Sequence, residues 1–205
     1  EPGRLGVLGA ASVPGVFIEA VRAARKISVA AIASRDRKRA TAVARGPGVA
    51  RVHATYEALL ADPESDAVYV PLPNNLHAEG SIRAANAGKH VLCEKPLASS
   101  ATEARAVFDA ARRNGVHLVE GYPYRAQPQT LKLRELLAGG AIGRVQMIQA
   151  AFGFPLPDAA NLPTERCLPG GPLMGAGPCP GCLGRGAPRP PPPRAPAAPP
   201  RSPPQ

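Results

Sequence analysis

The chain has 205 residues, of which 44% are apolar, and it carries a formal net charge of +10. This length is enough for one core of ordinary size, or for one domain and part of another. No stretch reaches the roughly 18 consecutive apolar residues of a membrane span, and no signal peptide opens the chain. These features argue against a membrane-spanning protein and predict a cytoplasmic one with no membrane partner.

The positive charge raises the question of a nucleic-acid partner, because basic chains bind nucleic acids or other anions. The basic residues are spread over the predicted helices, apart from the run RDRKR at 35–39. Aromatic residues make up only 4% of the chain, which leaves few platforms on which bases could stack. We therefore expect no nucleic acid among the partners.

Strand and helix patterns alternate in good order as far as residue 122. Near-continuous apolar strands that alternate with helices are typical of a parallel sheet covered on both faces. The predicted fold class is α/β, with a doubly wound parallel (Rossmann) sheet of the kind that binds dinucleotides. The expected strands are 4–10, 27–34, 49–54, 66–73, 90–95 and 116–122. The expected helices begin near Pro14 and Ser100 and cover 37–44, 55–61 and 77–88.

A second, incomplete α+β domain is predicted after Tyr122. Residues 129–140 have helical spacing, and the apolar run 143–154 is expected to be the first strand of a second sheet. The composition then changes near Cys167, and many of the 26 prolines crowd the end of the chain. The predicted organisation is a dinucleotide-binding domain over 1–122, the beginning of a substrate and oligomerisation domain over 123–166, and a disordered Gly/Pro/Arg-rich tail over 167–205.

Two of the four cysteines form a C-x-x-C pair, Cys179 and Cys182. A structural zinc site needs four ligands, and these typically come from two such pairs. Only Cys167 lies nearby, and no histidine follows. Accidental spacing is the simpler interpretation, so we expect no metal site.

The turn after the first strand is rich in small residues, as the stretch GVLGAASVPG (6–15) shows. In a dinucleotide fold such a turn lets the backbone approach the pyrophosphate, and the helix N-terminus offers N–H groups and a positive dipole. The G-x-G-x-x-G fingerprint is degenerate here, so a tight structural turn remains an alternative. Its place after the first strand favours cofactor binding. The predicted contacts are Gly9, Ala10, Ala11, Ser12 and Val13.

The end of the second strand indicates which dinucleotide is bound. An acidic residue at this point binds the ribose 2′-OH of NAD, but Ser34 stands here, with Arg35 and Arg39 after it. A hydroxyl and guanidinium groups suit a 2′-phosphate, since Arg binds phosphate bidentately. The sequence therefore predicts NADP, and Asp36 leaves NAD use open. The alternative is a solvated basic helix start that Asp36 caps.

The fourth strand ends in VPLPNNLHAE (70–79), and ligands of open α/β sheets bind beyond the carboxyl ends of strands. Asn74 and His77 are candidates to line the nicotinamide side. The alternative is that Asn75 caps the next helix and that His77 merely lies in its first turn. The predicted cofactor contacts are Leu72, Pro73, Asn74 and His77.

The fifth strand ends on charged residues, in HVLCEKPL (90–97). Pro96 cannot donate to a sheet ladder, so the strand should stop before it. Burying Glu94 and Lys95 costs free energy unless they are paired or have a function. The alternative to a functional site is a surface ion pair, which contributes little.

Together these motifs resemble one family. The sequence is similar to the glucose–fructose oxidoreductase / inositol dehydrogenase (Gfo/Idh/MocA) family over residues 4–154, and most of all to its branch of D-xylose and trans-dihydrodiol dehydrogenases. The passages that carry the resemblance are RLGVLGAASVPGVFIEAV, ASRDRKRA, DAVYVPLPNNLHAE, GKHVLCEKPLA and VHLVEGYPYRAQPQ. It implies an NAD(P)-dependent oxidoreductase that moves a hydride between nicotinamide and a secondary alcohol of a sugar or diol. Full-length members are expected to be homo-oligomers.

The resemblance assigns roles at the EKP motif and beyond it. Lys95 would face cofactor and substrate and stabilise developing alkoxide character. Glu94 would keep the strand tip and the lysine in place, and the Lys95–Pro96 bond would be cis. Glu94, Lys95 and Pro96 thus join the expected cofactor contacts. The resemblance also implies that the substrate pocket is bordered by Tyr122, Tyr124 and Arg125. The alternative is that these residues pack in the hinge to the second domain.

The family pattern breaks in GGPLMGAGPC (170–179), where members carry an aspartate and then a His or Tyr that completes the site. Gly175 and Cys179 stand at these two positions, and neither suits the proton transfer. We expect a misread or damaged reading frame after about Cys167, with a shortened protein that ends in a genuine tail as the alternative. A non-catalytic dinucleotide-binding module is therefore the second functional hypothesis.

Overall fold

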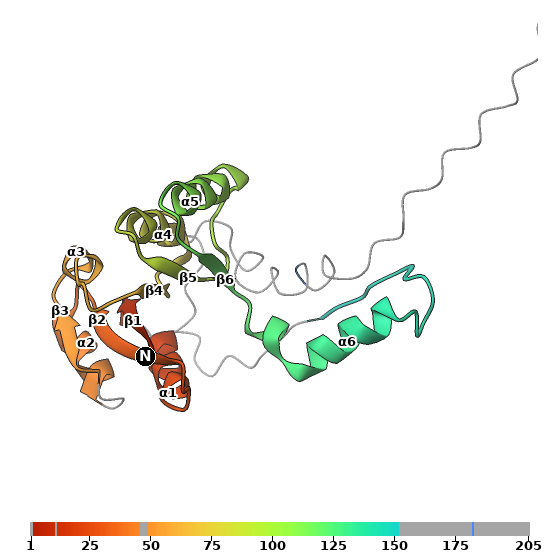
Figure 1. The fold of residues 1–205 in the computed structure, drawn as a ribbon, viewed down its shortest axis with the longest axis horizontal. Coiled ribbons are helices and arrows are strands. Elements are labelled where there is room, and N and C mark those ends of the chain that lie inside the picture. Colours follow the sequence, from red (N-terminus) through yellow and green to blue (C-terminus); the bar gives the residue numbers. More distant parts are fainter. Residues whose placement is uncertain (1, 11, 46–48, 152–181, 183–205) are drawn as a thin grey trace, which may run out of the picture.

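The computed structural model describes residues 2–10, 12–45, 49–151 and 182. Over these residues a six-stranded sheet is flanked by helices, as Figure 1 shows. The strands are β1 (Gly3–Leu8), β2 (Ile27–Ala33), β3 (Arg51–His53), β4 (Ala67–Val70), β5 (His90–Glu94) and β6 (Leu118–Gly121). The helices are α1 (Ser12–Arg22), α2 (Arg37–Arg45), α3 (Tyr56–Leu60), α4 (His77–Asn86), α5 (Ala101–Arg113) and α6 (Pro128–Ala138), with 3₁₀ turns η1 (Asn74–Leu76) and η2 (Pro123–Ala126).

The sheet has the order β3-β2-β1-β4-β5-β6, and every neighbouring pair is parallel. This confirms the predicted doubly wound sheet. The order reverses at β1, which lies between β2 and β4. Ligands of such sheets bind at this reversal, beyond the carboxyl ends of the strands.

Two apolar clusters cover the two faces of the sheet. Successive residues of a strand point to opposite faces, so Val7 packs in the cluster under α1 and α2, while Leu8 packs in the cluster under α3, α4 and α5. The same alternation separates Tyr69 from Val70 in β4. Burial on both faces explains why these strands are apolar throughout.

Prolines and glycines set several element boundaries. The fourth strand was predicted over 66–73 but ends at Val70, since Pro71 and Pro73 have no N–H for a ladder. The first strand ends at Leu8 because Gly9 turns the chain with a φ of 108°.

Two predicted helix caps are confirmed. The Thr55 side chain accepts a hydrogen bond from Ala58 N at the start of α3, at 3.1 Å. Ser100 accepts from Glu103 N at the start of α5, and the Glu103 carboxylate accepts from Ser99 N in return. The Ser100 bond is that of the expected capping box, but the returning Glu103 bond goes to Ser99 N, one residue before the cap, and not to the N–H of Ser100 itself.

The expected strand over 143–154 is wrong for the residues that the structure describes. Residues 143–151 form no strand, and 152–154 lie outside the described residues. A strand needs a partner for its N–H and C=O groups, and no described strand of the sheet lies beside this segment.

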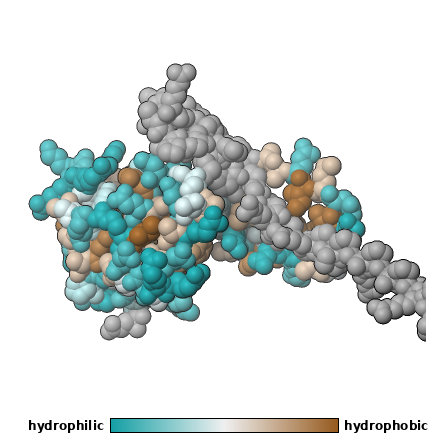
Figure 2. Space-filling view, turned by 90° about the horizontal axis from the view of Figure 1, so that it is seen from above, coloured by the Kyte–Doolittle hydropathy of each residue, from teal (hydrophilic) through white to brown (hydrophobic). Residues whose placement is uncertain are grey.

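Helix α6 stands clear of the sheet in Figure 1 and has no buried residue. Its apolar side chains are about half exposed, with Leu131 at 51% and Leu136 at 45%. Figure 2 shows this apolar surface in the region of α6. No helix of the described ranges is both long enough and apolar enough to cross a membrane.

Ion pairs hold the edge of the sheet at which the strands begin. Arg4, in β1, binds both carboxylate oxygens of Asp66, which directly precedes β4, with its backbone N and its guanidinium group. These hydrogen bonds lower the pKa of Asp66 to about 2. Nearby, the buried Asp62 carboxylate accepts from Arg51 Nε, at the start of β3, at 3.1 Å, and also lies 3.1 Å from His53 Nε2, at the end of that strand. The edge opposite the carboxyl ends is thus fixed by charge.

We predict that Asp66→Asn lowers the free energy of unfolding by about 1 kcal/mol near pH 7, a small value because the pair is partly exposed. The folded pKa of about 2 lies below the ordinary 3.8, so the contribution is complete above about pH 4 and is lost as the pH falls toward 2. Urea unfolding of both proteins across this range measures it. A difference between them that does not change with pH would contradict the assignment.

Candidate active site

The turn after β1 brings the chain close to its neighbours. Gly9 has a φ of 108°, which side-chain-bearing residues rarely adopt, and its N–H donates to Ala33 O at 2.7 Å. A Cβ atom on Gly9 would lie 3.3 Å from a methyl carbon of Leu72. Ala10 is buried and α1 begins two residues later, at Ser12. A tight turn of small residues that leads into a helix N-terminus is what the pyrophosphate turn of a dinucleotide site requires.

The structure describes only some residues of this predicted turn. Ala11 lies outside the described residues, and so do the side chains of Ser12 and Val13. The two residues that are described, Gly9 and Ala10, stand where the prediction put them, at the carboxyl end of β1.

The end of β2 carries the residues predicted to choose between NAD and NADP. Ser34 is buried, and its hydroxyl accepts from Asp36 N at 3.1 Å. The Asp36 carboxylate accepts from Arg39 N at 3.0 Å, which is the bond of a helix N-cap. The structure thus confirms Asp36 as the cap of α2. Arg35 and Arg39 are exposed at this end of the sheet.

The segment after β4 differs from one prediction. Asn75 does not cap α4, since it lies inside η1, and Leu76 precedes the helix without a side-chain cap. His77 is the first residue of α4 and only 1% exposed. Leu72 and Asn74 are half-buried between β4 and this helix, whereas Pro73 is exposed.

His77 joins two loops through its ring. Nδ1 lies 2.6 Å from Pro96 O, and Nε2 lies 2.6 Å from Leu72 O. A carbonyl oxygen only accepts, so both contacts are hydrogen bonds at once only when both ring nitrogens carry protons. The buried ring therefore connects the loop after β4 to the loop after β5.

The EKP motif is held from two directions. The Tyr69 hydroxyl donates to Glu94 Oε1 at 2.8 Å, and Lys95 N donates to Glu94 Oε2 at 3.3 Å. The Lys95–Pro96 bond is cis, as the resemblance implied. Glu94 and Lys95 are half-buried, directly at the carboxyl end of β5. Sequence reasoning missed Tyr69, although it is the one polar side chain in the apolar run of β4.

A second carboxylate, also missed from the sequence, reaches the residue after the motif. Glu120 of β6 accepts from Leu97 N at 2.8 Å, and both Pro96 and Leu97 are buried. A charged residue inside the otherwise apolar stretch VHLVEGY was the available signal.

Burial keeps two neighbouring groups neutral. It raises the pKa of Tyr69 well above its usual range, and the hydrogen bond to Glu94 raises it further. It also raises the pKa of the Cys93 thiol to about 12, with Glu120 and Glu94 adding to the effect. Tyr69 is therefore a donor to Glu94, and Cys93 is no nucleophile at neutral pH.

The residues predicted to border the substrate follow β6. Tyr122 and Tyr124 pack edge to face, with ring centroids 6.0 Å apart, and Arg125 is exposed in η2. This turn leads from the sheet to α6.

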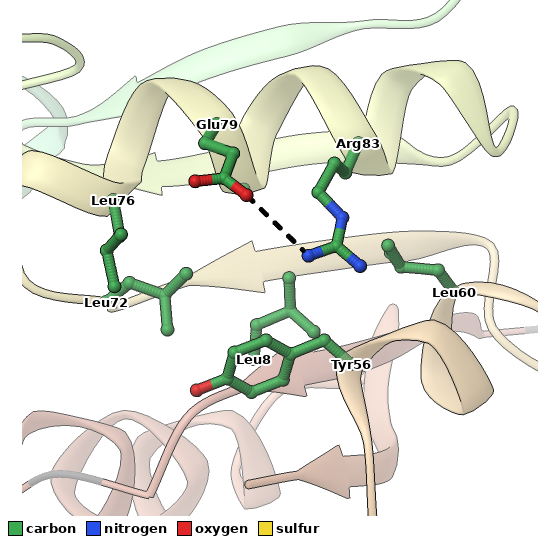
Figure 3. A pocket seen from close by; sticks show the side chains of 8 residues that line it. Leu8, Tyr56, Leu60, Leu72, Leu76, Glu79 and Arg83 are labelled. Carbon is green, nitrogen blue, oxygen red and sulfur yellow. Dashed lines mark ion pairs between the residues drawn. The ribbon is translucent and has the colours of Figure 1, made fainter. Parts of the chain in front are cut away.

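A small pocket opens between α3 and α4, shown in Figure 3. Glu79 and Arg83, one turn apart on α4, form an ion pair at 3.9 Å along one wall of it (Figure 3), and Arg83 also pairs with Glu57 of α3. The pocket volume is about 40 Å³. Drug-sized ligands occupy roughly 300–1,000 Å³, so the pocket itself cannot hold a dinucleotide. The side chains around it are Leu8, Tyr56, Leu60, Leu72, Leu76, Glu79 and Arg83.

The described residues hold no candidate metal cluster. Within the described ranges no three His, Cys, Asp or Glu side chains come together in a way that could hold a metal ion. Cys179, one half of the C-x-x-C pair, lies outside these residues, as does the stretch 170–179.

Comparison with known proteins shows which family model this chain matches. The model of the Gfo/Idh/MocA oxidoreductases, described as an oxidoreductase family with an NAD-binding Rossmann fold, matches residues 4–122. D-xylose 1-dehydrogenase (NADP(+)) 2 of Haloferax volcanii is 47% identical over 84% of this chain and 53% of its own length. A trans-1,2-dihydrobenzene-1,2-diol dehydrogenase of Danio rerio is 35% identical over 85% of this chain and 52% of its own length.

Solved structures show the same relationship. A variant of KijD10, a 3-ketoreductase from Actinomadura kijaniata in complex with TDP-benzene and NADP, superimposes with a TM-score of 0.77 at 37% identity. The match covers 85% of this chain and 54% of that one. The chain thus spans about half the length of the relatives that it matches.

We predict that Gly9→Ala lowers the free energy of unfolding by about 1–2 kcal/mol, because a Cβ atom is strained at this φ. The substitution should also weaken the binding of NADPH, because relief of the backbone strain and of the close approach to Leu72 displaces the turn that is proposed to hold the pyrophosphate. Fluorescence titration with NADPH and urea unfolding measure the two effects.

Gly115→Ala is the matched control. Gly115 also has a positive φ, 64°, but a Cβ atom there meets nothing within 4 Å. We expect a similar loss of stability with unchanged NADPH affinity. Equal losses of affinity in both variants would show that the turn after β1 has no special part in binding.

Proposed function

Since the chain belongs to the Gfo/Idh/MocA family of oxidoreductases, we propose that it is the dinucleotide-binding part of an NADP-preferring dehydrogenase. The reaction is hydride transfer between nicotinamide and a secondary alcohol of a sugar or diol. Lys95 acts on the substrate oxygen.

The observation that carries this proposal is the gathering of the candidate residues at one edge of the sheet. Gly9, Ser34, Leu72 and Lys95 directly follow or lie close behind β1, β2, β4 and β5. All four strands are parallel, so their carboxyl ends share that edge. Two distances support this closeness: a Cβ atom on Gly9 would lie 3.3 Å from Leu72, and Leu72 O lies 2.6 Å from His77 Nε2.

The residues present fit a dinucleotide. The N-terminus of α1, which follows closely after Gly9 and Ala10, offers backbone N–H groups to the pyrophosphate. At the end of β2, Arg35 and Arg39 are exposed and suit a 2′-phosphate, while the Asp36 carboxylate already caps α2. When bound, the nicotinamide accepts or supplies the hydride at its C4 atom.

Lys95 is the proposed catalytic residue. A protonated amine near the reacting oxygen stabilises the negative charge that develops there as an alcohol becomes a carbonyl group, or the reverse. The backbone around it is fixed by Glu94 and Tyr69, which places the charge without reorganisation during the reaction. Tyr122, Tyr124 and Arg125 are proposed to line the substrate side, where β6 leads out of the sheet.

The substrate class rests on the names of relatives. One relative is a D-xylose dehydrogenase, another a dihydrodiol dehydrogenase, and KijD10 binds a TDP compound with NADP. We propose a sugar or a diol as the substrate of this protein as well.

A non-catalytic dinucleotide-binding module is the second candidate. It is favoured by Gly175 and Cys179, which stand where members of the family carry proton-transferring residues. Both candidates require NADP binding, and they differ only in turnover.

We predict that the chain binds NADPH more tightly than NADH, and that Arg35→Ala weakens NADPH binding by roughly 10- to 100-fold, the worth of a charge-assisted hydrogen bond. NADH affinity should not change, because NADH has no 2′-phosphate. Arg45→Ala, at the other end of α2, removes the same charge and should leave both affinities as they are. Equal affinity of the wild type for the two cofactors would refute the NADP preference.

Turnover separates the two candidates. With NADP⁺ and D-xylose or a trans-dihydrodiol, the dehydrogenase hypothesis predicts NADPH formation that Lys95→Met abolishes while NADPH affinity stays within about threefold, since the cofactor is held mainly elsewhere. Turnover that survives this substitution would contradict the role of Lys95. Tight binding with no turnover in the wild type would favour the non-catalytic module.

A further inference from the structure

We propose that Glu120 is a positioning residue for Lys95 and acts through the peptide unit between Pro96 and Leu97. This inference rests on the proposed function, in which Lys95 acts on the substrate. Glu120 itself is assigned no contact with cofactor or substrate.

The peptide unit between Pro96 and Leu97 is held at both of its polar groups. Its C=O lies 2.6 Å from the His77 ring, which comes from α4. Its N–H donates to the Glu120 carboxylate, which comes from β6, at 2.8 Å. A peptide plane held on both sides cannot rotate without breaking both hydrogen bonds. The plane that follows Lys95–Pro96 is therefore fixed.

The chain before Lys95 is fixed as well. Glu94 accepts a hydrogen bond from the Tyr69 hydroxyl with one carboxylate oxygen and from Lys95 N with the other. Tyr69 is 2% exposed and stacks on Phe17 of α1, with ring centroids 4.1 Å apart. Lys95 thus sits between two anchored segments, and Glu120 supplies one of the anchors.

Glu120 is presented from a rigid position. In the parallel register Glu120 pairs with Cys93, and Gly121 pairs with Glu94. A Cβ atom on Gly121 would lie 3.2 Å from Cys93 O, so β6 approaches β5 closely at this point. The Glu120 carboxylate reaches past the end of β5 and accepts from Leu97 N. Leu97 is buried and lies outside any strand or helix. Such an N–H needs a partner, and Glu120 provides it.

The test compares two conservative substitutions that separate reach from charge. Glu120→Gln keeps the side-chain length and an oxygen acceptor but removes the charge. Glu120→Asp keeps the charge but is one methylene shorter, so it cannot reach Leu97 N. The reporter is ¹³C-dimethylated Lys95, observed by NMR in the chain without ligand and assigned by its absence in Lys95→Arg.

We expect a displaced or split Lys95 signal in Glu120→Asp, and in Glu120→Gln a signal within one linewidth of the wild type. Exchange of the Leu97 amide hydrogen should be slow in the wild type and faster in Glu120→Asp. An unprotected Leu97 amide in the wild type would overturn the inference without any substitution.

Glu103→Ala is the matched control. Glu103 also accepts from a nearby backbone N–H, that of Ser99, at 2.8 Å, but it belongs to the cap of α5. It should lower stability and leave the Lys95 signal unchanged. A Lys95 signal that moves as much in Glu103→Ala as in Glu120→Asp would reduce Glu120 to a general structural role and overturn the inference.

The outcome is distinguishable from failure of the proposed function. The Lys95 signal and Leu97 exchange are measured without cofactor or turnover. A chain that shows the expected signals but binds no NADPH would refute the proposed function alone. A chain that binds NADPH and keeps its Lys95 signal in Glu120→Asp would refute the positioning role alone.

Discussion

The buried ring of His77 is the contact on which the candidate site depends. With 1% exposure and both nitrogens 2.6 Å from backbone carbonyls, it joins the loop after β4 to the loop after β5. Those carbonyl groups lie beyond the sheet ladder and need partners of their own. From this ring a line of contacts runs outward, through Leu72 to Gly9 on one side and through the peptide after Pro96 to Glu120 on the other. It crosses the sheet edge from β1 to β6.

This line of contacts gives the proposed function its physical basis. Parallel strands bring the ends of β1, β2, β4 and β5 to one edge, but strand ends alone leave flexible loops. Catalysis by a fixed charge requires that the group be held before the reaction begins, which hydrogen bonds from several elements achieve. At the opposite edge, ion pairs around Arg4 and Asp62 hold the beginnings of the strands. Ion pairs thus hold the end of the sheet at which the strands begin. At the carboxyl end, His77 and Glu120 hold the loops through hydrogen bonds to backbone groups.

Much of the fold follows from the sequence because its signals are local: strand periodicity, the caps at Thr55 and Ser100, and prolines after β4. The partners of the site did not follow in this way. Tyr69 and Glu120 meet the EKP segment only through the sheet order, at sequence separations of 25 and 23 residues. The predicted strand is wrong over 143–151 for a related reason, because apolar composition indicates that a strand is favourable but not that a partner strand lies beside it.

Binding of NADP at the carboxyl edge of the sheet can be followed residue by residue in backbone amide NMR spectra recorded with and without NADP⁺. We predict that the largest shifts fall on Gly9, Ala10, Ser34 and Arg35 and on the loops after β4 and β5. Amides at the Arg4 and Asp62 edge and in α6 should stay unchanged. Shifts concentrated at that opposite edge, or no saturable shifts at all, would contradict the claim.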